Sequence, residues 1–250
     1  MAKLLEICVD SLASARAAIR GGADRLELCS ALLAGGLTPY EALLRQIRAE
    51  SDVEIRCLMR PRPGDFLYTS EELAMIRQQI LSLKEAGADG FVIGCLTARG
   101  DLDTAAIKPL IEACGSKGIT LHRCIDVSRN PEETYLQAGK MGIDTVLTSG
   151  AAASCRQGQE TIEKLIALRD NENGPEVLIG AGVNAAVIRH FRQSVPGACA
   201  FHASCKEELE STMCFRRTGV PMGLPGLDEW HIQQTSETAV RAARTVLDEL

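Results

Sequence analysis

Several patterns that would place this sequence in a familiar class of protein are missing from it. No CxxC pair occurs among its 10 cysteines, so a structural zinc knuckle is not expected. No stretch approaches the roughly 18 apolar residues of a membrane span, and Glu6 and Asp10 interrupt the N-terminal apolar run where a secretory signal would be continuous. We therefore expect a cytoplasmic protein with no membrane contact, whose cysteines are mostly reduced packing residues.

The sequence also lacks a basic stripe and a dividing linker. Its net charge is −6 and its arginines are scattered among acidic residues, so nothing matches the phosphate backbone of a nucleic acid. Hydrophobic residues make up 46% of the chain and charged residues 24%, which is enough apolar material for one sizeable core. We expect a single domain over residues 1–250 and no nucleic acid partner.

What the sequence does contain is a strict alternation of strand-like and helical runs. Eight apolar segments with strand character lie at 4–9, 25–29, 54–59, 89–96, 119–125, 143–150, 176–182 and 198–205. The crossovers between them are long enough for parallel pairing, which predicts an α/β protein of the (β/α)8 TIM-barrel class. An open doubly wound sheet is the alternative, but it usually has a Gly-rich dinucleotide turn after its first strand, and here that turn reads CVDSLAS.

The connection between the eighth strand and the last helix is unusually long, at about residues 205–235. Connections of this length in a compact domain are often active-site lids, so the segment could fold over the opening of the barrel. Arg216 and Arg217 would then face a cavity; the alternative is a solvated surface pair.

Two similar stretches on the first two strands, LEIC and LELC, each place a carboxylate and a thiol on one face. Side chains alternate along a strand, so Glu6 shares a face with Cys8, and Glu27 shares a face with Cys29. The aliphatic residues between them suit the helix layer, which leaves both Glu-Cys pairs pointing into the barrel. Charges are hardly ever buried without partners, so oppositely charged groups are expected nearby.

Candidate partners end the other strands, close to the mouth where barrel enzymes have their active sites. The predicted ring of ionisable groups consists of Glu6, Glu27, Arg60, His122, Asp126 and His202. One reading is a structural polar network that plugs the barrel. We favour a functional reading, because interior layers are normally filled by branched aliphatic residues. Such a ring is suited to acid-base chemistry on a small anionic metabolite.

Two further sites follow from the residue types. Cys8 and Cys29, on adjacent strands, could hold a soft ion such as Cu(I), although two cysteines that merely pack together would look the same in sequence. The GAGVN stretch presents small residues and backbone N–H groups at the start of a helix, where anions bind readily. Gly180 and Gly182, with Ser204 from the last strand, therefore form a candidate anion or phosphate site.

Taken together, the most distinctive segments resemble those of the CutC family, often called copper homeostasis proteins. They are, in chain order, EICVDS, GGADRLELC, GGLTP, RPRPGDFLY, DGFVIGCLT, LHRCIDV, VLTSG, and FHAS followed by MCFRR. The resemblance runs through nearly the whole chain. One departure is Pro63, where the family motif usually reads RPRGGDF. Proline supplies neither a positive φ nor a backbone donor, so this loop must be arranged differently if the family glycine serves either purpose.

The resemblance implies a cytosolic TIM barrel that forms homodimers or larger assemblies and binds Cu(I). It also implies that Cys8 and Cys29 are the copper ligands. A protein that only buffers Cu(I) needs soft sulfur and has no need of Glu27, Arg60 or His122. We therefore expect copper handling as the main function, and an enzyme acting on a small anionic or phosphorylated metabolite as the alternative.

Overall fold

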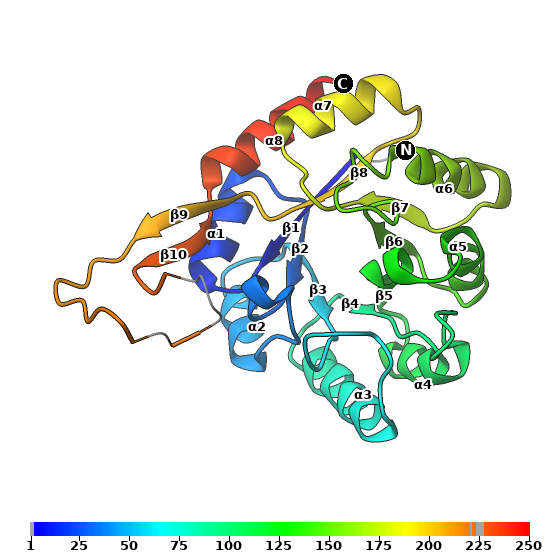
Figure 1. The fold of residues 1–250 in the computed structure, drawn as a ribbon, viewed down its shortest axis with the longest axis horizontal. Coiled ribbons are helices and arrows are strands. Elements are labelled where there is room, and N and C mark those ends of the chain that lie inside the picture. Colours follow the sequence, from blue (N-terminus) through cyan, green and yellow to red (C-terminus); the bar gives the residue numbers. More distant parts are fainter. Residues whose placement is uncertain (1–2, 221, 224–227) are drawn as a thin grey trace.

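The computed structural model describes residues 3–220, 222–223 and 228–250, and its centre is a closed barrel of eight parallel strands (Figure 1). Each strand pairs with the next, and the last pairs with the first. The predicted (β/α)8 TIM barrel is confirmed. The strands are β1 (Leu4–Val9), β2 (Arg25–Leu28), β3 (Glu54–Leu58), β4 (Gly90–Ile93), β5 (Gly118–Leu121), β6 (Thr145–Thr148), β7 (Glu176–Ile179) and β8 (Ala200–Ala203).

Helices surround the barrel and cover its outer face (Figure 1). They are α1 (Leu12–Gly21), α2 (Glu41–Arg48), α3 (Ser70–Glu85), α4 (Thr104–Cys114), α5 (Pro131–Lys140), α6 (Gln159–Glu172), α7 (Ala185–Ser194) and α8 (Glu237–Glu249). Local sequence sets their starts: Thr69 forms a capping box with Glu72, and Asn130 caps α5 just before Pro131. Within the described ranges, no helix is long and apolar enough to cross a membrane.

The pairing register of β1 with β2 sets the depth of each inward side chain. Cys8 pairs with Glu27, and Glu6 pairs with Arg25, so the LEIC and LELC stretches are offset by two residues. Glu27 therefore lies level with Cys8, while Glu6 lies one layer deeper, where it also pairs with His202 of β8. The alternate residues of both strands are fully buried against the helices, as predicted: Leu5, Ile7, Leu26 and Leu28.

The fifth strand is shorter than the sequence indicates. β5 ends at Leu121, and a 3-10 turn, η2 (Arg123–Val127), follows in place of the predicted second half of the strand. His122 caps this turn, because its Nδ1 accepts a hydrogen bond from the backbone N–H of Cys124 at 3.2 Å. The predicted strand over 119–125 is therefore too long: His122 follows the strand, and Asp126 belongs to η2.

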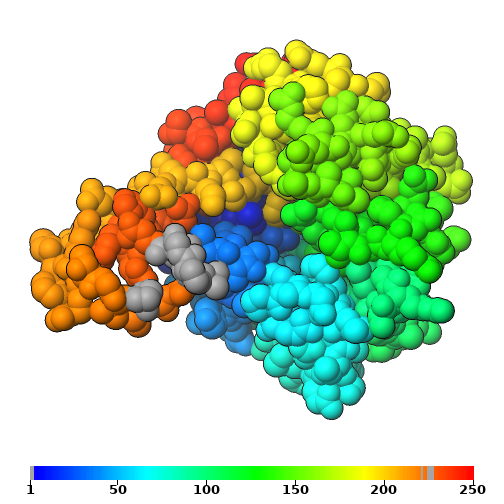
Figure 2. Space-filling model, viewed as in Figure 1, coloured from blue at the N-terminus to red at the C-terminus, as the bar shows by residue number. Residues whose placement is uncertain are grey.

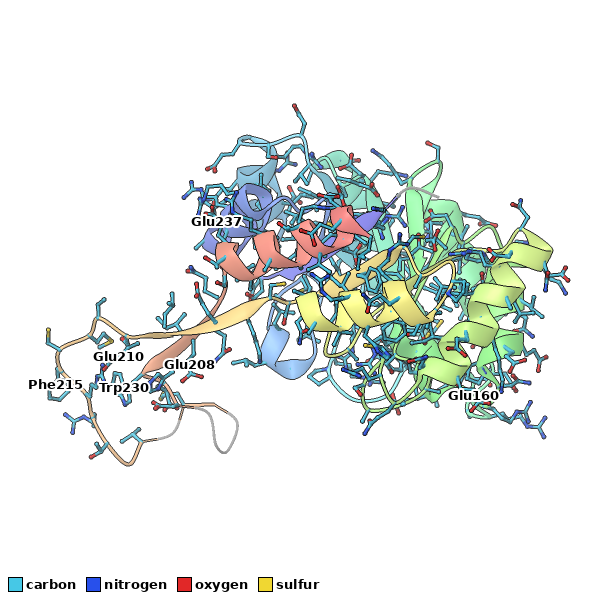
Figure 3. The ribbon with its side chains drawn as sticks, turned by 90° about the horizontal axis from the view of Figure 1, so that it is seen from above. Glu160, Glu208, Glu210, Phe215, Trp230 and Glu237 are labelled. Atoms are coloured by element: carbon cyan, nitrogen blue, oxygen red, sulfur yellow. The ribbon has the colours of Figure 1, made fainter. Side chains whose placement is uncertain are left out.

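In the long connection before α8, the described residues 206–220, 222–223 and 228–235 form an arm. Its root is a two-stranded antiparallel sheet of β9 (Lys206–Glu210) and β10 (His231–Thr235). The arm projects sideways from the barrel, as the orange segment of Figures 1 and 2 and the side view of Figure 3 show. Residues 206–220, 222–223 and 228–235 do not fold over the barrel mouth, so the predicted lid is wrong for this part of the connection. Residues 221 and 224–227 lie outside the described residues.

The two arginines of the arm pack against aromatic rings on the arm itself. The Arg216 guanidinium lies 5.6 Å from the centre of the Trp230 ring, and Arg217 lies 5.6 Å from that of Phe215. Neither arginine lines the cavity described below. Figure 3 shows Phe215 and Trp230 on the part of the arm that stands away from the barrel.

Candidate functional site

A cavity of about 960 Å³ opens at the carboxyl ends of the barrel strands. Its walls come from the ends of β1, β2, β3, β6 and β8, from the loops after β2, β3, β5 and β7, and from the root of the arm. Small-molecule sites have volumes of roughly 300–1,000 Å³, and TIM-barrel enzymes place their active sites at this end. The cavity is thus where the sequence predicts a site, and it is far larger than an ion requires.

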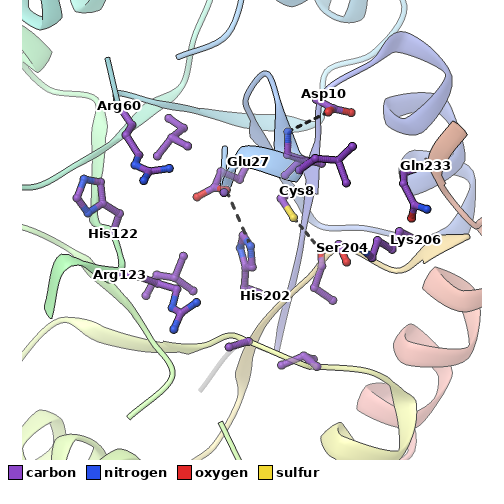
Figure 4. Close-up of a pocket in the computed structure, with 18 of the residues that line it drawn as sticks. Cys8, Asp10, Glu27, Arg60, His122, Arg123, His202, Ser204, Lys206 and Gln233 are labelled. Atoms are coloured by element: carbon purple, nitrogen blue, oxygen red, sulfur yellow. Dashed lines mark hydrogen bonds and ion pairs between the residues drawn. The ribbon is translucent and has the colours of Figure 1, made fainter. Parts of the chain in front are cut away.

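Glu27 and His202 lie in the middle of the cavity (Figure 4). The Nε2 atom of His202 is 3.9 Å from a carboxylate oxygen of Glu27. The other ring nitrogen, Nδ1, is 2.7 Å from a carboxylate oxygen of Glu6. Glu6 does not line the cavity: it is fully buried beneath it, where it also accepts a 2.5 Å hydrogen bond from Nε of Arg25. Glu6 therefore holds His202 from below.

These groups shift one another's pKa values in opposite directions. Burial alone would raise the pKa of Glu6, but the neighbouring Arg25 and His202 outweigh burial and lower it to about 2. Burial raises the pKa of Glu27 to about 7, and the opposing attraction of His202 does not cancel that effect. Burial acts to lower the pKa of His202, yet the negative charge around it raises that pKa well above the usual value. Glu27 can therefore take up or release a proton near neutral pH.

Cys8 adds a thiol to this centre. It is 6% exposed, and among the described residues it is the one cysteine in the cavity wall. One ligand atom each from Cys8, Glu27 and His202 lie within 4.8 Å of one another. A thiolate and an imidazole suit Cu(I) or Zn²⁺, whereas a carboxylate is a harder ligand. The three residues thus form a candidate metal site.

Cys29 lies outside this group of three donors. Its thiol is fully buried and donates a 3.4 Å hydrogen bond to the carbonyl of Val9. Its side chain packs against Leu58 and Val92, and burial, together with the nearby Glu27 carboxylate, raises its pKa well above the usual value for a thiol. Because of the two-residue offset between β1 and β2, Cys8 lies opposite Glu27 instead of opposite Cys29.

Arg60 forms part of the opposite wall of the cavity (Figure 4). Backbone carbonyls hold its terminal nitrogens: Nη1 donates to Ala34 at 3.1 Å and to Gly36 at 3.0 Å, and Nη2 donates to Gly64 at 3.3 Å. Its guanidinium lies 5.5 Å from the centre of the Phe66 ring. Neutral carbonyls do not cancel a positive charge, so the guanidinium keeps its charge at the cavity wall.

His122 stands beside Arg60 on the same wall (Figure 4). It is 4% exposed, and its ring centre lies 4.8 Å from that of Phe66. Burial and the charge of Arg60 lower its pKa to about 3, so the ring is neutral at physiological pH. Because Nδ1 accepts from a backbone N–H, the ring proton resides on Nε2. That Nε2 is buried and has no hydrogen-bond partner in the described structure.

Asp126 also borders the cavity, but both of its carboxylate oxygens already accept hydrogen bonds. It accepts hydrogen bonds from Thr148, from the side chain and backbone N–H of Ser149, and from Arg123 at 2.7 Å. These bonds attach η2 to the loop after β6. The chemistry of a free acid or base is therefore not available from Asp126 without breaking this network.

The candidate anion corner is only partly at the cavity surface. Gly182 and Ser204 line the cavity. Gly180 lies just behind: its N–H donates to the carbonyl of Thr148, and a Cβ there would come within 2.7 Å of Leu147. Anion binding at this corner stays a prediction.

Arg25 is the main site residue that the sequence interpretation missed. It precedes Glu27 by two residues on the same strand, so the same alternation that turns Glu27 inward also turns Arg25 inward. A basic residue at this position is the partner that the buried Glu6 requires. Arg123, which borders the cavity and pairs with Asp126, was also missed, because the strand was expected to continue through it.

The sequence comparisons with known proteins agree on one family. The model of the CutC family matches residues 3–207, which ends where the arm begins. The CutC family protein of Chromobacterium violaceum is 39% identical over 249 residues, covering 99% of each chain. The corresponding protein of Vibrio vulnificus strain YJ016 is 37% identical over 243 residues, covering 96% of each chain.

A solved structure supports the same conclusion. The putative copper homeostasis protein CutC from Streptococcus agalactiae superposes with a TM-score of 0.75 at 26% sequence identity, covering 81% of this chain and 98% of that one. The sequence match over most of the chain and the shared barrel together show that this chain belongs to the CutC family.

Proposed function

We propose that this protein handles Cu(I) in the cytoplasm and that the ion binds in the cavity through Cys8. The observation that carries the proposal is the group of three donors, in which the Cys8 thiol, an imidazole nitrogen of His202 and a carboxylate oxygen of Glu27 lie within 4.8 Å of one another. Cu(I) is a soft ion that prefers thiolate and imidazole ligands. Cys8 and His202 are therefore the ligands that the geometry favours, with Glu27 as a nearby negative charge. Because the pKa of His202 is raised, its Nε2 must release a proton when it binds the ion.

The family resemblance adds Cys29 as a second thiolate. In the structure its sulfur contacts the Val9 carbonyl, so binding an ion together with Cys8 requires the Cys29 side chain to turn away from that bond. The two cysteines thus make separable contributions. Loss of Cys8 removes the ligand that faces the cavity, whereas loss of Cys29 tests the ligand pair implied by the family.

A competition titration with Cu(I) and a chromogenic chelator tests this assignment. The reduced protein should carry C214A throughout, because Cys214 is the one exposed thiol of the described residues and could bind copper adventitiously. In that background C8A should weaken Cu(I) binding by more than the roughly 10- to 100-fold that loss of a supporting residue costs. C57A, which removes a fully buried thiol of the helix-facing core, is the matched control and should leave the affinity unchanged.

The outcomes separate the ligand sets. If C8A binds Cu(I) as tightly as the C214A parent, the proposed site is wrong. If C8A and H202Q weaken binding but C29A does not, the ion is held by Cys8 and His202 without the second thiol. If C29A weakens binding as much as C8A, the ligand pair implied by the resemblance is supported.

A second copy of this chain is the protein partner that we propose, as the resemblance implies. The arm is the surface that supports it, since an isolated two-stranded hairpin is only marginally stable in water. Apolar side chains are exposed beyond its root: Met213 is 59% exposed and Phe215 67%. Sedimentation analysis should give a dimer or larger assembly for the natural chain and a smaller one for an M213S/F215S variant. A natural chain that sediments as a monomer would rule this partner out.

A further inference from the structure

The wall of the cavity opposite Cys8 contains two hydrogen-bond donors that the copper site does not use. They are Nε of Arg60 and Nε2 of His122, and both are buried without a partner in the described structure. A buried donor left unsatisfied costs about 1–3 kcal/mol, so such atoms in a folded protein call for an explanation. Two of them side by side in a cavity wall indicate a missing acceptor.

The charge of this wall indicates which acceptor fits. Arg60 bonds only to backbone carbonyls, and it takes part in none of the ion pairs found among the described residues. His122 is a neutral donor, as its bond from Cys124 requires. The wall therefore offers one uncompensated positive charge and two N–H groups. A carboxylate, with one negative charge and two oxygens, satisfies both conditions.

Phe66 explains why the two donors are hidden in the free chain. Its half-buried side chain lines the cavity and packs against both residues, with its ring centre 5.5 Å from the Arg60 guanidinium and 4.8 Å from the His122 ring. The backbone of Phe66 is fixed, because its carbonyl accepts a 2.8 Å bond from the N–H of Leu96. Rotation of the Phe66 side chain alone would open the wall without moving the loop.

We propose that Arg60 and His122 form a binding site for the carboxylate of a small organic acid, and that the Phe66 ring covers this site until the ligand displaces it. The rest of such a ligand would extend across the cavity towards Glu27 and His202, which lie between this wall and Cys8 (Figure 4). The cavity volume of about 960 Å³ accommodates a metabolite, which an ion site alone would not require. The site goes beyond Cu(I) handling and does not depend on it.

The Nε2 proton of His122 is a direct probe of this site. The chain has four histidines, so side-chain NMR signals of the ¹⁵N-histidine-labelled protein can be assigned with single His→Gln variants. Pyruvate is the probe ligand; methyl pyruvate, which has the same shape without the charge, and inorganic phosphate are the comparisons. We expect a saturable change at the His122 Nε2–H with pyruvate, and no saturable change with the ester.

Three variants test which side chains contribute to pyruvate binding. R60K keeps the charge but loses the fork of donors, and should raise the pyruvate concentration needed for half-saturation by about tenfold or more, equivalent to about 1.4 kcal/mol. R62M is the matched control: Arg62 lies two residues away, is paired with Glu72, and does not line the cavity, so half-saturation should not change. F66A should bind pyruvate at the same or a lower concentration, because the cover is removed.

Each other outcome has a defined meaning. No saturable change at His122 up to about 100 mM pyruvate, or the same half-saturation in R60K and the natural chain, would overturn the site. Stronger saturation by phosphate than by pyruvate would overturn the assignment to a carboxylate. Weaker binding in F66A would show that Phe66 contacts the ligand instead of covering the site. The C8A variant should bind pyruvate normally, so failure of this proposal and failure of the copper proposal are distinguishable.

Discussion

Replacing Glu6 with Gln should destabilise the barrel more than any exchange of a surface carboxylate. The Glu6 side chain is fully buried, and it bonds at once to Arg25 at 2.5 Å and to His202 at 2.7 Å. The variant keeps the shape of the side chain but removes its charge. The Arg25 side chain is only 4% exposed, so in the variant its guanidinium is buried with Glu54, at 3.7 Å, as its remaining carboxylate partner.

Two independent arguments give the same loss in the free energy of unfolding for E6Q. Removing one partner of a buried ion pair costs about 3–5 kcal/mol. A carboxyl pKa of about 2 in place of 4.5 favours the folded state by about 3 kcal/mol at neutral pH. We therefore expect a loss of about 3 kcal/mol in the free energy of unfolding. With a urea dependence of about 3 kcal/mol per M, the unfolding midpoint should fall by about 1 M.

Urea unfolding followed by far-UV circular dichroism measures this loss. Fluorescence is less suitable, because the single tryptophan, Trp230, lies on the arm and not in the barrel. The matched control is E50Q. Glu50 binds Arg16 with similar geometry, at 2.5 Å and 2.7 Å, but the two side chains are 42% and 50% exposed. Exposed pairs of this kind contribute at most about 1 kcal/mol, so E50Q should shift the midpoint only slightly.

The pH dependence gives an independent test. The folded-state pKa of Glu6 is lowered, so its contribution is complete above the unfolded value of 4.5 and is lost as the pH falls towards about 2. E6Q cannot titrate at this position. The difference in stability between the natural chain and E6Q should therefore be constant from pH 7 to about pH 5 and shrink below it.

Two results would refute this reasoning. The first is an equal midpoint shift for E6Q and E50Q, because burial would then not decide the value of the pair. The second is a double variant, E6L/R25M, that is less stable than E6Q. Replacing both charges by apolar side chains of similar size removes the unpaired guanidinium, so the double variant should recover most of the lost stability.

Three further predictions concern other parts of the molecule. The pKa of His122 is lowered to about 3 in the folded chain, so its contribution to stability is complete above pH 6.5, the unfolded value, and is lost as the pH falls towards 3. Urea unfolding should therefore show that the natural chain loses stability relative to H122N as the pH is lowered from about 6.5 to 4. G94A should weaken pyruvate binding in the NMR titration, because its Cβ would lie 2.7 Å from the His122 ring and 2.6 Å from the sulfur of Cys124. G21A should lower the free energy of unfolding, measured by urea titration, by about 1–3 kcal/mol despite the better helix propensity of Ala, because the added Cβ would lie 2.5 Å from Val240. The double variant G21A/V240A should recover part of the loss.

The sequence predicts the barrel well because each strand and helix carries its own local signal. Alternation along β1 and β2 is enough to turn Glu6, Cys8 and Glu27 inward and their neighbours towards the helices. The same rule, applied to Arg25, would have turned it inward as a candidate partner for the buried carboxylates. The position of the cavity at the carboxyl ends of the strands also follows from the fold class alone, because all βα loops lie at that end of a parallel barrel.

Depth within the barrel could not be predicted in this way. LEIC and LELC read alike, so the sequence suggests that the two glutamates are equivalent. The stagger between neighbouring strands, which no local pattern encodes, shifts the second stretch by two residues and pairs Cys8 with Glu27. Two residues along a strand correspond to roughly 6.6 Å. That offset places Glu6 beneath the cavity and Glu27 inside it.

The end of β5 and the course of the arm were not predictable for related reasons. The segment ITLHRCI is apolar enough for a strand throughout, but a local side-chain hydrogen bond ends it. The His122 side chain accepts the backbone N–H of Cys124 and starts a turn, which competes with continued strand pairing. The length of the arm suggests a lid. Its actual direction depends on the pairing of β9 with β10, which continues away from the barrel mouth.

The buried charges of the barrel explain why the reactive groups lie at its mouth. Outside the cavity lining, Arg56 is 2.6 Å from Asp144, and Arg25 is 2.5 Å from Glu6. These pairs are compensated and therefore structural. At the mouth, Glu27 has its nearest cationic partner, His202, at 3.9 Å, and the charge of Arg60 meets only backbone carbonyls. A charge without a close partner costs free energy in the folded chain. A ligand that supplies the partner recovers that cost, so the same residues that weaken the free barrel are those able to bind an ion or an organic acid.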